Sequence, residues 1–235
     1  MHNAEFLVAV DVTAGAAGPR AEALVRLATG VDEEWIKPTS RDVVHTLDES
    51  GVVRAMRRDL YDQLPIREHP VAPDPVVAAK LVEDEYLRRG PTEADAMLVN
   101  RCVFAGVTMS LQALVHEAAM GQTRVDDVRV DAHVPPDVRR ALDRDAPVTL
   151  RLPAGRTVKL DYRDDGRVLV STRLQDVFGM KETPRLGRRK VPVTFELLAP
   201  NGRPVQVTTD LASFWSKAYP EIKKELSRRY PKHKW

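Results

Sequence analysis

Short apolar runs, separated by turn-forming residues, fill the first seventy positions of the chain and are typical of β-strands. Asp48–Gly51 and Gly15–Pro19 are the clearest turns, because Gly, Pro, Ser and Asp favour a reversal of the chain. Five or so short strands with turns between them predict a small OB-like β-barrel over residues 1–71. The runs expected to form strands are Phe6–Val12, Glu22–Thr29, Val31–Ile36, Asp42–Leu47, Val52–Leu60 and Gln63–His69.

A helical segment is predicted over residues 72–146. Pro70, Pro73 and Pro75 mark a linker, and beyond them apolar residues recur at a spacing of three and four. Thr92 is expected to cap one helix, because Asp95 three residues later can complete a capping box. The expected helices are Val76–Arg89, Thr92–Ala105, Met109–Met120 and Pro136–Asp143.

Residues 147–235 return to strand-like runs and end in a helix. Turns at Arg163–Arg167 and Pro200–Gly202 predict antiparallel β-hairpins, and Pro220 predicts a kink or two short helices in the terminal segment. The whole chain is therefore expected to be an α+β fold whose last helix is amphipathic. The expected strands are Val148–Leu152, Thr157–Tyr162, Val168–Ser171, Val191–Leu198 and Val205–Thr208. The apolar stripe of the helix is Leu211, Phe214, Trp215, Ile222 and Leu226.

Charge is distributed unevenly along the chain, although the net charge is only +2. Residues 151–235 carry 19 Lys and Arg against 9 Asp and Glu, a net charge of +10, and residues 1–150 carry 17 against 25, a net charge of −8. A positive C-terminal region predicts a polyanionic partner such as a nucleic acid. Attraction between the two regions within the fold is the alternative.

Composition indicates a globular protein of the cytoplasm. The chain is 43% hydrophobic and 30% charged, and no apolar run approaches the ~20 residues that a membrane helix needs, so no membrane insertion is expected. The first residues show no basic and apolar pattern of a secretory signal. The single cysteine, Cys102, excludes an internal disulfide and suits a reducing compartment.

Residues for catalysis or metal binding follow no known pattern. A phosphate-binding loop that hydrolyses ATP is Gly-rich and ends in Gly-Lys-Ser/Thr, and the sequence has no Gly-Lys dipeptide and no Asp-Glu-x-His motif. The six histidines lack ligand spacing, and no Cys-x-x-Cys is present. We expect no catalytic residue, no metal site and no cofactor in this chain, and no enzymatic activity of the chain by itself.

Basic residues form the candidate binding surface. Arg185–Lys190 places four cations in six residues, and arginine can grip a phosphate with two hydrogen bonds. A solvated, solubilising surface is the alternative for this loop and for the cations of the terminal helix. Phe214 and Trp215 are expected to pack in the core, whereas Tyr230 and Trp235 are candidates for stacking on bases. The candidate nucleic-acid-binding residues are Arg54, Arg57, Arg58, Arg185, Arg188, Arg189, Lys190, Arg203, Gln206, Lys223, Lys224, Arg228, Arg229 and Lys232.

The amino-acid sequence of the C-terminal segment is distinctive. Its characteristic stretches are Thr172–Met180, Thr183–Arg185, Val191–Val193, Leu197–Pro200, Arg203–Thr208, Asp210–Trp215, Tyr219, Lys223–Leu226 and Arg229–His233. Together they closely resemble the C-terminal signature of HrpB, a bacterial family of DEAH-type ATP-dependent helicases. Phe6–Val10 and Arg26–Ala28 resemble, more weakly, the segment that follows the motor in that family.

The resemblance implies a non-catalytic C-terminal module of an RNA or DNA helicase. ATP and Mg²⁺ would belong to the motor lobes, which this sequence lacks, and an OB-like domain behind the motor is common in such helicases. We expect the module to bind single-stranded RNA or DNA and to support motor lobes in cis or in trans. The alternative is a protein-interaction scaffold that docks on the motor, or on another protein, without touching nucleic acid.

Overall fold

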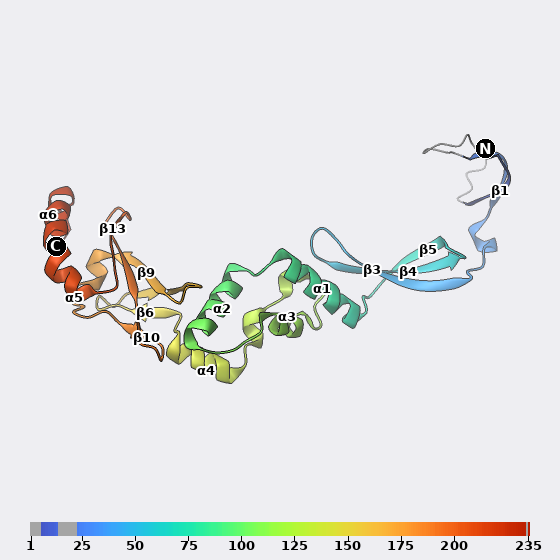
Figure 1. The fold of residues 1–235 in the computed structure, drawn as a ribbon. Coiled ribbons are helices and arrows are strands. Elements are labelled where there is room, and N and C mark those ends of the chain that lie inside the picture. The colour runs from blue at the N-terminus through green and yellow to red at the C-terminus, as the bar shows by residue number, and fades with distance from the viewer. Residues whose placement is uncertain (1–5, 14–22, 234) are drawn as a thin grey trace. The chain divides into compact units, whose positions relative to one another are not determined.

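The computed structural model describes residues 6–13, 23–233 and 235 (Figure 1). Its residues group into two compact units. Unit 1 comprises Met1–Glu85 with Met120–Asp127, and unit 2 comprises Tyr86–Ala119 with Val128–Trp235. The helical connector expected over residues 72–146 is therefore divided between the two units. The predicted division of the chain into three domains, with boundaries at residues 71 and 146, stays a prediction. The turn expected at Gly15–Pro19 lies outside the described residues.

Unit 1 contains two antiparallel sheets. In one, β1 (Phe6–Thr13) pairs with β2 (Leu24–Val31). In the other, β3 (Ser40–Leu47), β4 (Val53–Tyr61) and β5 (Leu64–Val71) form a meander. No strand pairing joins the two sheets within the described residues, so the meander keeps two open edges and the OB-like barrel is not confirmed.

The strand predicted over Val31–Ile36 is not formed, so that prediction is wrong. Val31 ends β2, and the acidic residues after it form a short 3-10 helix, η1 (Glu33–Trp35). The run has only polar residues between Val31 and Trp35, so it offers no alternating apolar face that could keep it in a sheet. Trp35 is accordingly 72% exposed.

The helices follow the predicted boundaries closely. Thr92 and Asp95 form the expected capping box, with the Thr92 hydroxyl accepting from the Asp95 N–H at 3.2 Å and Asp95 accepting from the Thr92 N–H at 2.9 Å. The α-helices are α1 (Pro75–Arg89), α2 (Glu93–Ala105), α3 (Leu111–Ala119) and α4 (Pro136–Asp145). Further 3-10 turns are η2 (Val125–Asp127), η3 (Val130–His133) and η4 (Leu174–Val177).

A four-stranded sheet organises the C-terminal part of unit 2, in the order β13-β12-β9-β8. Its strands are β8 (Asp161–Tyr162), β9 (Val168–Arg173), β12 (Thr194–Leu198) and β13 (Pro204–Thr208). The hairpins β8–β9 and β12–β13 are antiparallel as predicted. The two hairpins meet through a parallel pairing of β9 with β12, so the expectation of antiparallel hairpins alone is wrong at the centre of the sheet.

The parallel pairing requires a crossover between the two central strands. The crossover contains η4 and a small hairpin of β10 (Arg185–Leu186) with β11 (Val191–Pro192). A separate hairpin joins β6 (Thr149–Arg151) to β7 (Thr157–Lys159). The core of unit 2 collects apolar side chains from these strands and the helices, and its largest fully buried members are Tyr162, Phe195, Leu142, Leu160, Leu174, Leu197 and Leu211.

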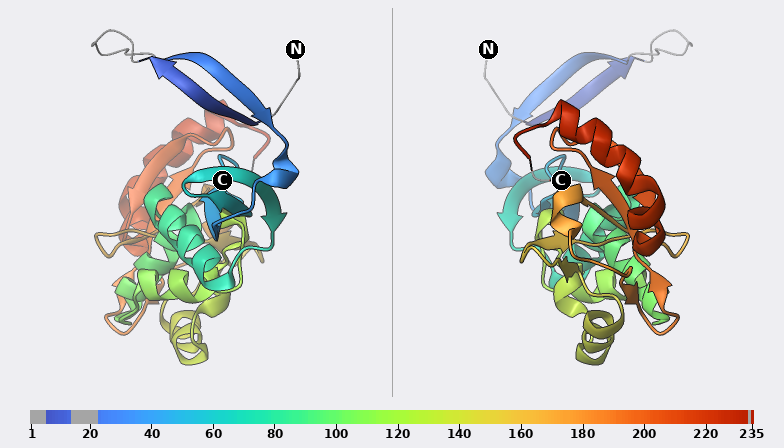
Figure 2. Two further views of the ribbon diagram at one scale, coloured as in Figure 1. Left: turned by 90° about the vertical axis from the view of Figure 1, so that its right-hand side faces the viewer. Right: turned by 90° about the vertical axis from the view of Figure 1, so that its left-hand side faces the viewer.

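The terminal segment stays helical from residue 211 to 229, with a π-turn ahead of Pro220 in place of the predicted kink or two short helices. α5 (Leu211–Ser213) is capped by Asp210, whose carboxylate accepts from the Ser213 N–H at 3.0 Å. A π-turn, η5 (Phe214–Ala218), leads into α6 (Tyr219–Arg229), where Pro220 occupies the first turn. Figure 2 shows α6, in red, beside the orange strands of the sheet. Of the expected apolar stripe, Leu211, Phe214 and Leu226 are buried, whereas Trp215 and Ile222 are partly exposed.

Candidate nucleic-acid interface

The three candidate arginines of unit 1 lie on β4 but do not share one face. Side chains alternate along a strand, so Arg54 and Arg58 project from one side of the sheet and Arg57 from the other. Arg54 donates to Asp48 at 2.9 Å, and Arg58 makes two hydrogen bonds to Asp42, at 2.9 and 2.5 Å. Two of the three cations are therefore already neutralised within the sheet.

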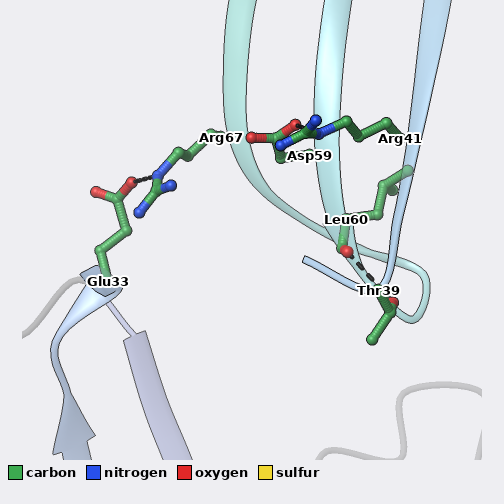
Figure 3. A network of polar contacts seen from close by, with 6 residues as sticks. All are labelled: Glu33, Thr39, Arg41, Asp59, Leu60 and Arg67. Carbon is green, nitrogen blue, oxygen red and sulfur yellow. Dashed lines mark hydrogen bonds and ion pairs between the residues drawn. The ribbon is translucent and has the colours of Figure 1, made fainter. Parts of the chain in front are cut away.

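Ion pairs occupy further cations of unit 1 as well (Figure 3). Arg41 of β3 donates to Asp59 of β4 at 2.9 Å, and Arg67 of β5 donates to Glu33 of η1. The hydrogen bond from Arg58 holds the pKa of Asp42 below its ordinary value, so that carboxylate stays charged near neutral pH. This sheet presents paired charges rather than a continuous cationic surface.

The basic loop Arg185–Lys190 is held against the body of unit 2. Arg188 approaches Asp145 at the end of α4 at 3.4 Å, and Arg189 makes a long hydrogen bond of 3.5 Å to the Val103 carbonyl of α2. Arg185 donates to the Lys190 carbonyl across the hairpin at 3.2 Å. Three of the four predicted phosphate-binding cations thus have contacts within the fold, and the Lys190 side chain is exposed.

Asp145 is the centre of this attachment. Arg144 donates to it at 2.9 Å from the neighbouring position, and Arg188 adds a second positive charge. The hydrogen bond from Arg144, more than the charge of Arg188, holds the pKa of Asp145 below its ordinary value. Sequence reasoning missed Asp145 because its partner lies more than forty positions away along the chain.

The cations of α6 lie on different faces of the helix. Ile222, Glu225, Leu226 and Arg229 recur at a spacing of three and four and line one groove. Arg228 is turned by about 100° from Arg229. The remaining candidates are all exposed: Lys224 donates to Glu221 at 2.7 Å, while Lys223 and Lys232 form no ion pair among the described residues.

A groove between the β12–β13 turn and α6 brings two candidates together. Arg203 follows the turn and Arg229 lies near the end of α6, and both line a hollow of about 270 Å³. Asn201 and Tyr230 line the same hollow. Gln206, by contrast, donates to the Val207 carbonyl of its own strand at 3.0 Å and does not line the groove. This groove is the arrangement of candidate residues that sequence spacing could not show.

Two further hollows of unit 2 were not anticipated. A depression of about 760 Å³ between α2 and the sheet carries Arg156, Lys159 and Arg163, of which Arg156 and Arg163 form ion pairs with Asp176 and Asp161. An apolar hollow of about 520 Å³ is lined by Phe178, Gly179, Met180, Lys181, Trp215, Tyr219 and Trp235. The Trp215 indole donates to the Met180 carbonyl at 2.6 Å, which fixes one wall of that hollow.

The described part of the chain shows neither a cluster of metal-ligating side chains nor a membrane-spanning helix. Over residues 6–13, 23–233 and 235, no three His, Cys, Asp or Glu side chains gather where they could ligate one ion. In the same residues no helix combines the length and apolarity that crossing a bilayer requires.

Comparison with known proteins identifies the family. The family model of the HrpB ATP-dependent helicase C-terminal region matches residues 108–235, more than half of the chain. The chain belongs to the HrpB family. The resemblance drawn from the C-terminal motifs is thereby confirmed.

Relatives of the HrpB family align with nearly the whole chain. The ATP-dependent RNA helicase HrpB of Escherichia coli K12 is 29% identical over 265 residues, which covers 98% of this chain and 32% of the relative. Two solved structures of E. coli HrpB, described as a DExH-box NTPase and as a DEAH/RHA helicase, share the fold with TM-scores of 0.61 and 0.55. Their sequence identities are 24% and 23%, and the match covers 99% of this chain and 33% of each. The chain thus spans about a third of the length of these relatives.

Proposed function

We propose that this chain is a non-catalytic C-terminal module of an HrpB-type helicase and that its unit 2 binds single-stranded RNA. ATP and Mg²⁺ would be bound by motor lobes that act with the module in cis or in trans. The reducing cytoplasm expected from the lone buried Cys102 suits this role.

The observation that carries the proposal is that the two units differ in how many of their candidate cations already form ion pairs. In unit 1, Arg54 and Arg58 are neutralised by neighbouring carboxylates. In unit 2, eight candidate cations form no ion pair within the described residues: Arg185, Arg189, Lys190, Arg203, Lys223, Arg228, Arg229 and Lys232. Because these side chains need not break an ion pair first, phosphates can bind them at lower cost in free energy.

Salt dependence tests the proposal. The full chain should bind a fluorescein-labelled single-stranded RNA of about 20 nucleotides in an anisotropy titration. If about four phosphates are contacted, the affinity should fall about fiftyfold between 50 and 200 mM KCl, since each contact on a single strand contributes about −0.7 to the slope of log K against log salt. Absence of binding at 50 mM KCl, or binding indifferent to salt, would refute nucleic-acid binding.

A charge-reversal pair locates the binding surface. Lys223→Glu with Lys232→Glu should weaken binding more than about tenfold, because both side chains are exposed in unit 2. Arg57→Glu in unit 1 is the matched control, since Arg57 is equally exposed and likewise forms no ion pair among the described residues. A loss from Arg57→Glu as large as that from the pair would show that binding is not confined to unit 2.

Docking on a motor is a second candidate function, and the apolar hollow favours it. Its walls are aromatic, and Phe178, Trp215 and Tyr219 pack with ring centroids 5.0–5.9 Å apart. An exposed apolar concavity of this kind suits a protein surface better than a phosphate chain. A pull-down with separately expressed HrpB motor lobes should then succeed at high salt and fail after Trp235→Ala; retention by the variant would exclude this hollow as the docking site.

A further inference from the structure

The groove between the β12–β13 turn and α6 has rigid walls on both sides. The turn is closed by the Ala199 N–H donating to the Arg203 carbonyl at 2.8 Å and the Gly202 N–H donating to the Ala199 carbonyl at 2.9 Å. On the opposite side, the Tyr230 N–H donates to the Leu226 carbonyl at 2.7 Å and ends α6. Both arginine-bearing segments are therefore fixed before any ligand arrives.

The charges in the groove favour an anion. Neither Arg203 nor Arg229 forms an ion pair with any residue that the structure describes, and the Arg229 guanidinium lies 5.9 Å from the centroid of the Tyr230 ring. Such a contact holds the guanidinium over the ring without neutralising it. Glu225 is the one acidic side chain among the described residues that line the groove, so two positive charges face one negative charge.

We propose that this groove holds a single phosphate group of the RNA strand between Arg203 and Arg229. The proposal rests on the RNA binding proposed above and names the residues that grip one backbone phosphate. Arg203 would approach from the hairpin and Arg229 from the helix, each with its planar fork of N–H donors. Tyr230 is a positioning residue that keeps the Arg229 guanidinium in place.

Other features of the groove repel a phosphate, so both arginines are needed to bind one. Glu225 repels a phosphate, and the carbonyl end of α6 carries partial negative charge. With one arginine removed, the remaining positive charge is balanced by Glu225, and the groove loses its net attraction. The two arginines should therefore act as a unit rather than as independent contacts.

A double-mutant cycle on the full chain tests this coupling. With a fluorescein-labelled single-stranded RNA of about 12 nucleotides at 50–200 mM KCl, Arg203→Ala and Arg229→Ala should each weaken binding about tenfold. The double variant should bind little more weakly than either single variant, whereas two independent contacts would give about a hundredfold loss. The salt slope should become less negative by about 0.7 in all three variants, because one phosphate contact is lost in each.

Arg228→Ala is the matched control, since it removes the same charge one residue away on a different face of α6. It should weaken binding less than about threefold. Arg229→Lys, which keeps the charge but loses the fork, should bind more weakly than wild type. Glu225→Gln should tighten binding about threefold at 50 mM KCl by removing the repulsion, and no tightening would count against a phosphate seated there.

The possible outcomes separate the two proposals. If wild type binds with the expected salt dependence but Arg203→Ala and Arg229→Ala behave like Arg228→Ala, the groove is excluded and RNA binding by unit 2 stands. If the two losses multiply, the arginines contact separate phosphates and the shared site is wrong. If wild type does not bind at all, both proposals fail. Unchanged circular dichroism of each variant shows that the fold is intact.

Discussion

Gly187 offers a sensitive test of how the basic loop is attached to unit 2. Its backbone has φ +68°, in the left-handed region that other L-residues rarely adopt. A Cβ atom at this position would lie 2.9 Å from Cε1 of Phe104 and 3.3 Å from the Asp145 carbonyl oxygen. Gly187→Ala therefore combines backbone strain with a collision against a packed ring.

The two effects can be separated with a second glycine. Gly202 has φ +80°, and no heavy atom lies within 4 Å of the place that a Cβ would take there, so Gly202→Ala carries only the backbone cost of about 1 kcal/mol. At Gly187 the ring of Phe104 must also move, although it is buried and packs edge-on against Tyr162 at 4.9 Å. Overpacking of this kind adds about 1–3 kcal/mol, so we expect Gly187→Ala to lower the free energy of unfolding by about 2–4 kcal/mol.

Chemical denaturation followed by tryptophan fluorescence measures the difference, because Trp215 and Trp235 both belong to unit 2. The urea midpoint should fall clearly further for Gly187→Ala than for Gly202→Ala. Adding Phe104→Leu should relieve part of the collision and narrow the gap between the two glycine variants. Equal midpoints for the two glycine variants would refute the idea that the loop is seated tightly on α2 and α4.

Three further predictions concern individual contacts. Thr92→Ala should lower stability by about 1 kcal/mol through loss of the capping box with Asp95, and an unchanged thermal midpoint would contradict that role. Asp145 has a lowered folded-state pKa, so its stabilising contribution is complete above about pH 5 and is lost as pH falls below the ordinary carboxyl value near 4. Asp145→Asn should therefore make the stability of unit 2 less dependent on pH between about 5 and 2; an unaltered pH profile would exclude the linkage. Trp215→Phe removes the hydrogen bond to Met180 and should cost about 1 kcal/mol in a urea titration, while Trp235→Phe, which removes a longer bond, should cost less.

Local patterns in the sequence predicted local structure well. Thr92 and Asp95 are three residues apart, so the capping box depends only on the helix that they begin. Pro220 lacks a backbone N–H, and it lies in the first turn of α6, where the sequence had placed it. Phe214 was correctly placed in the core because helical spacing aligned it with Leu211.

Contacts between residues that lie far apart in the sequence could not be predicted in the same way. Nothing in the composition of β9 or β12 indicates that they run parallel, since both are short apolar runs of the kind found in either type of sheet. The candidate cations show the same limit, because their availability depends on distant partners. Arg188 was expected to be free until the fold placed it near Asp145, and Arg203 meets Arg229 only because α6 lies beside the β12–β13 turn.

The parallel contact of β9 with β12 also sets an order of events during synthesis. β9 emerges from the ribosome before β12, and until then the two-residue strand β8 is the strand that pairs with it in the sheet. A hairpin of that size is at best marginally stable in water, so β9 presents an apolar edge during the interval. Between the completion of Arg173 and the arrival of Thr194 this edge of β9 is consequently open to misassociation, and we expect a chaperone that shields it to raise the yield of folded protein.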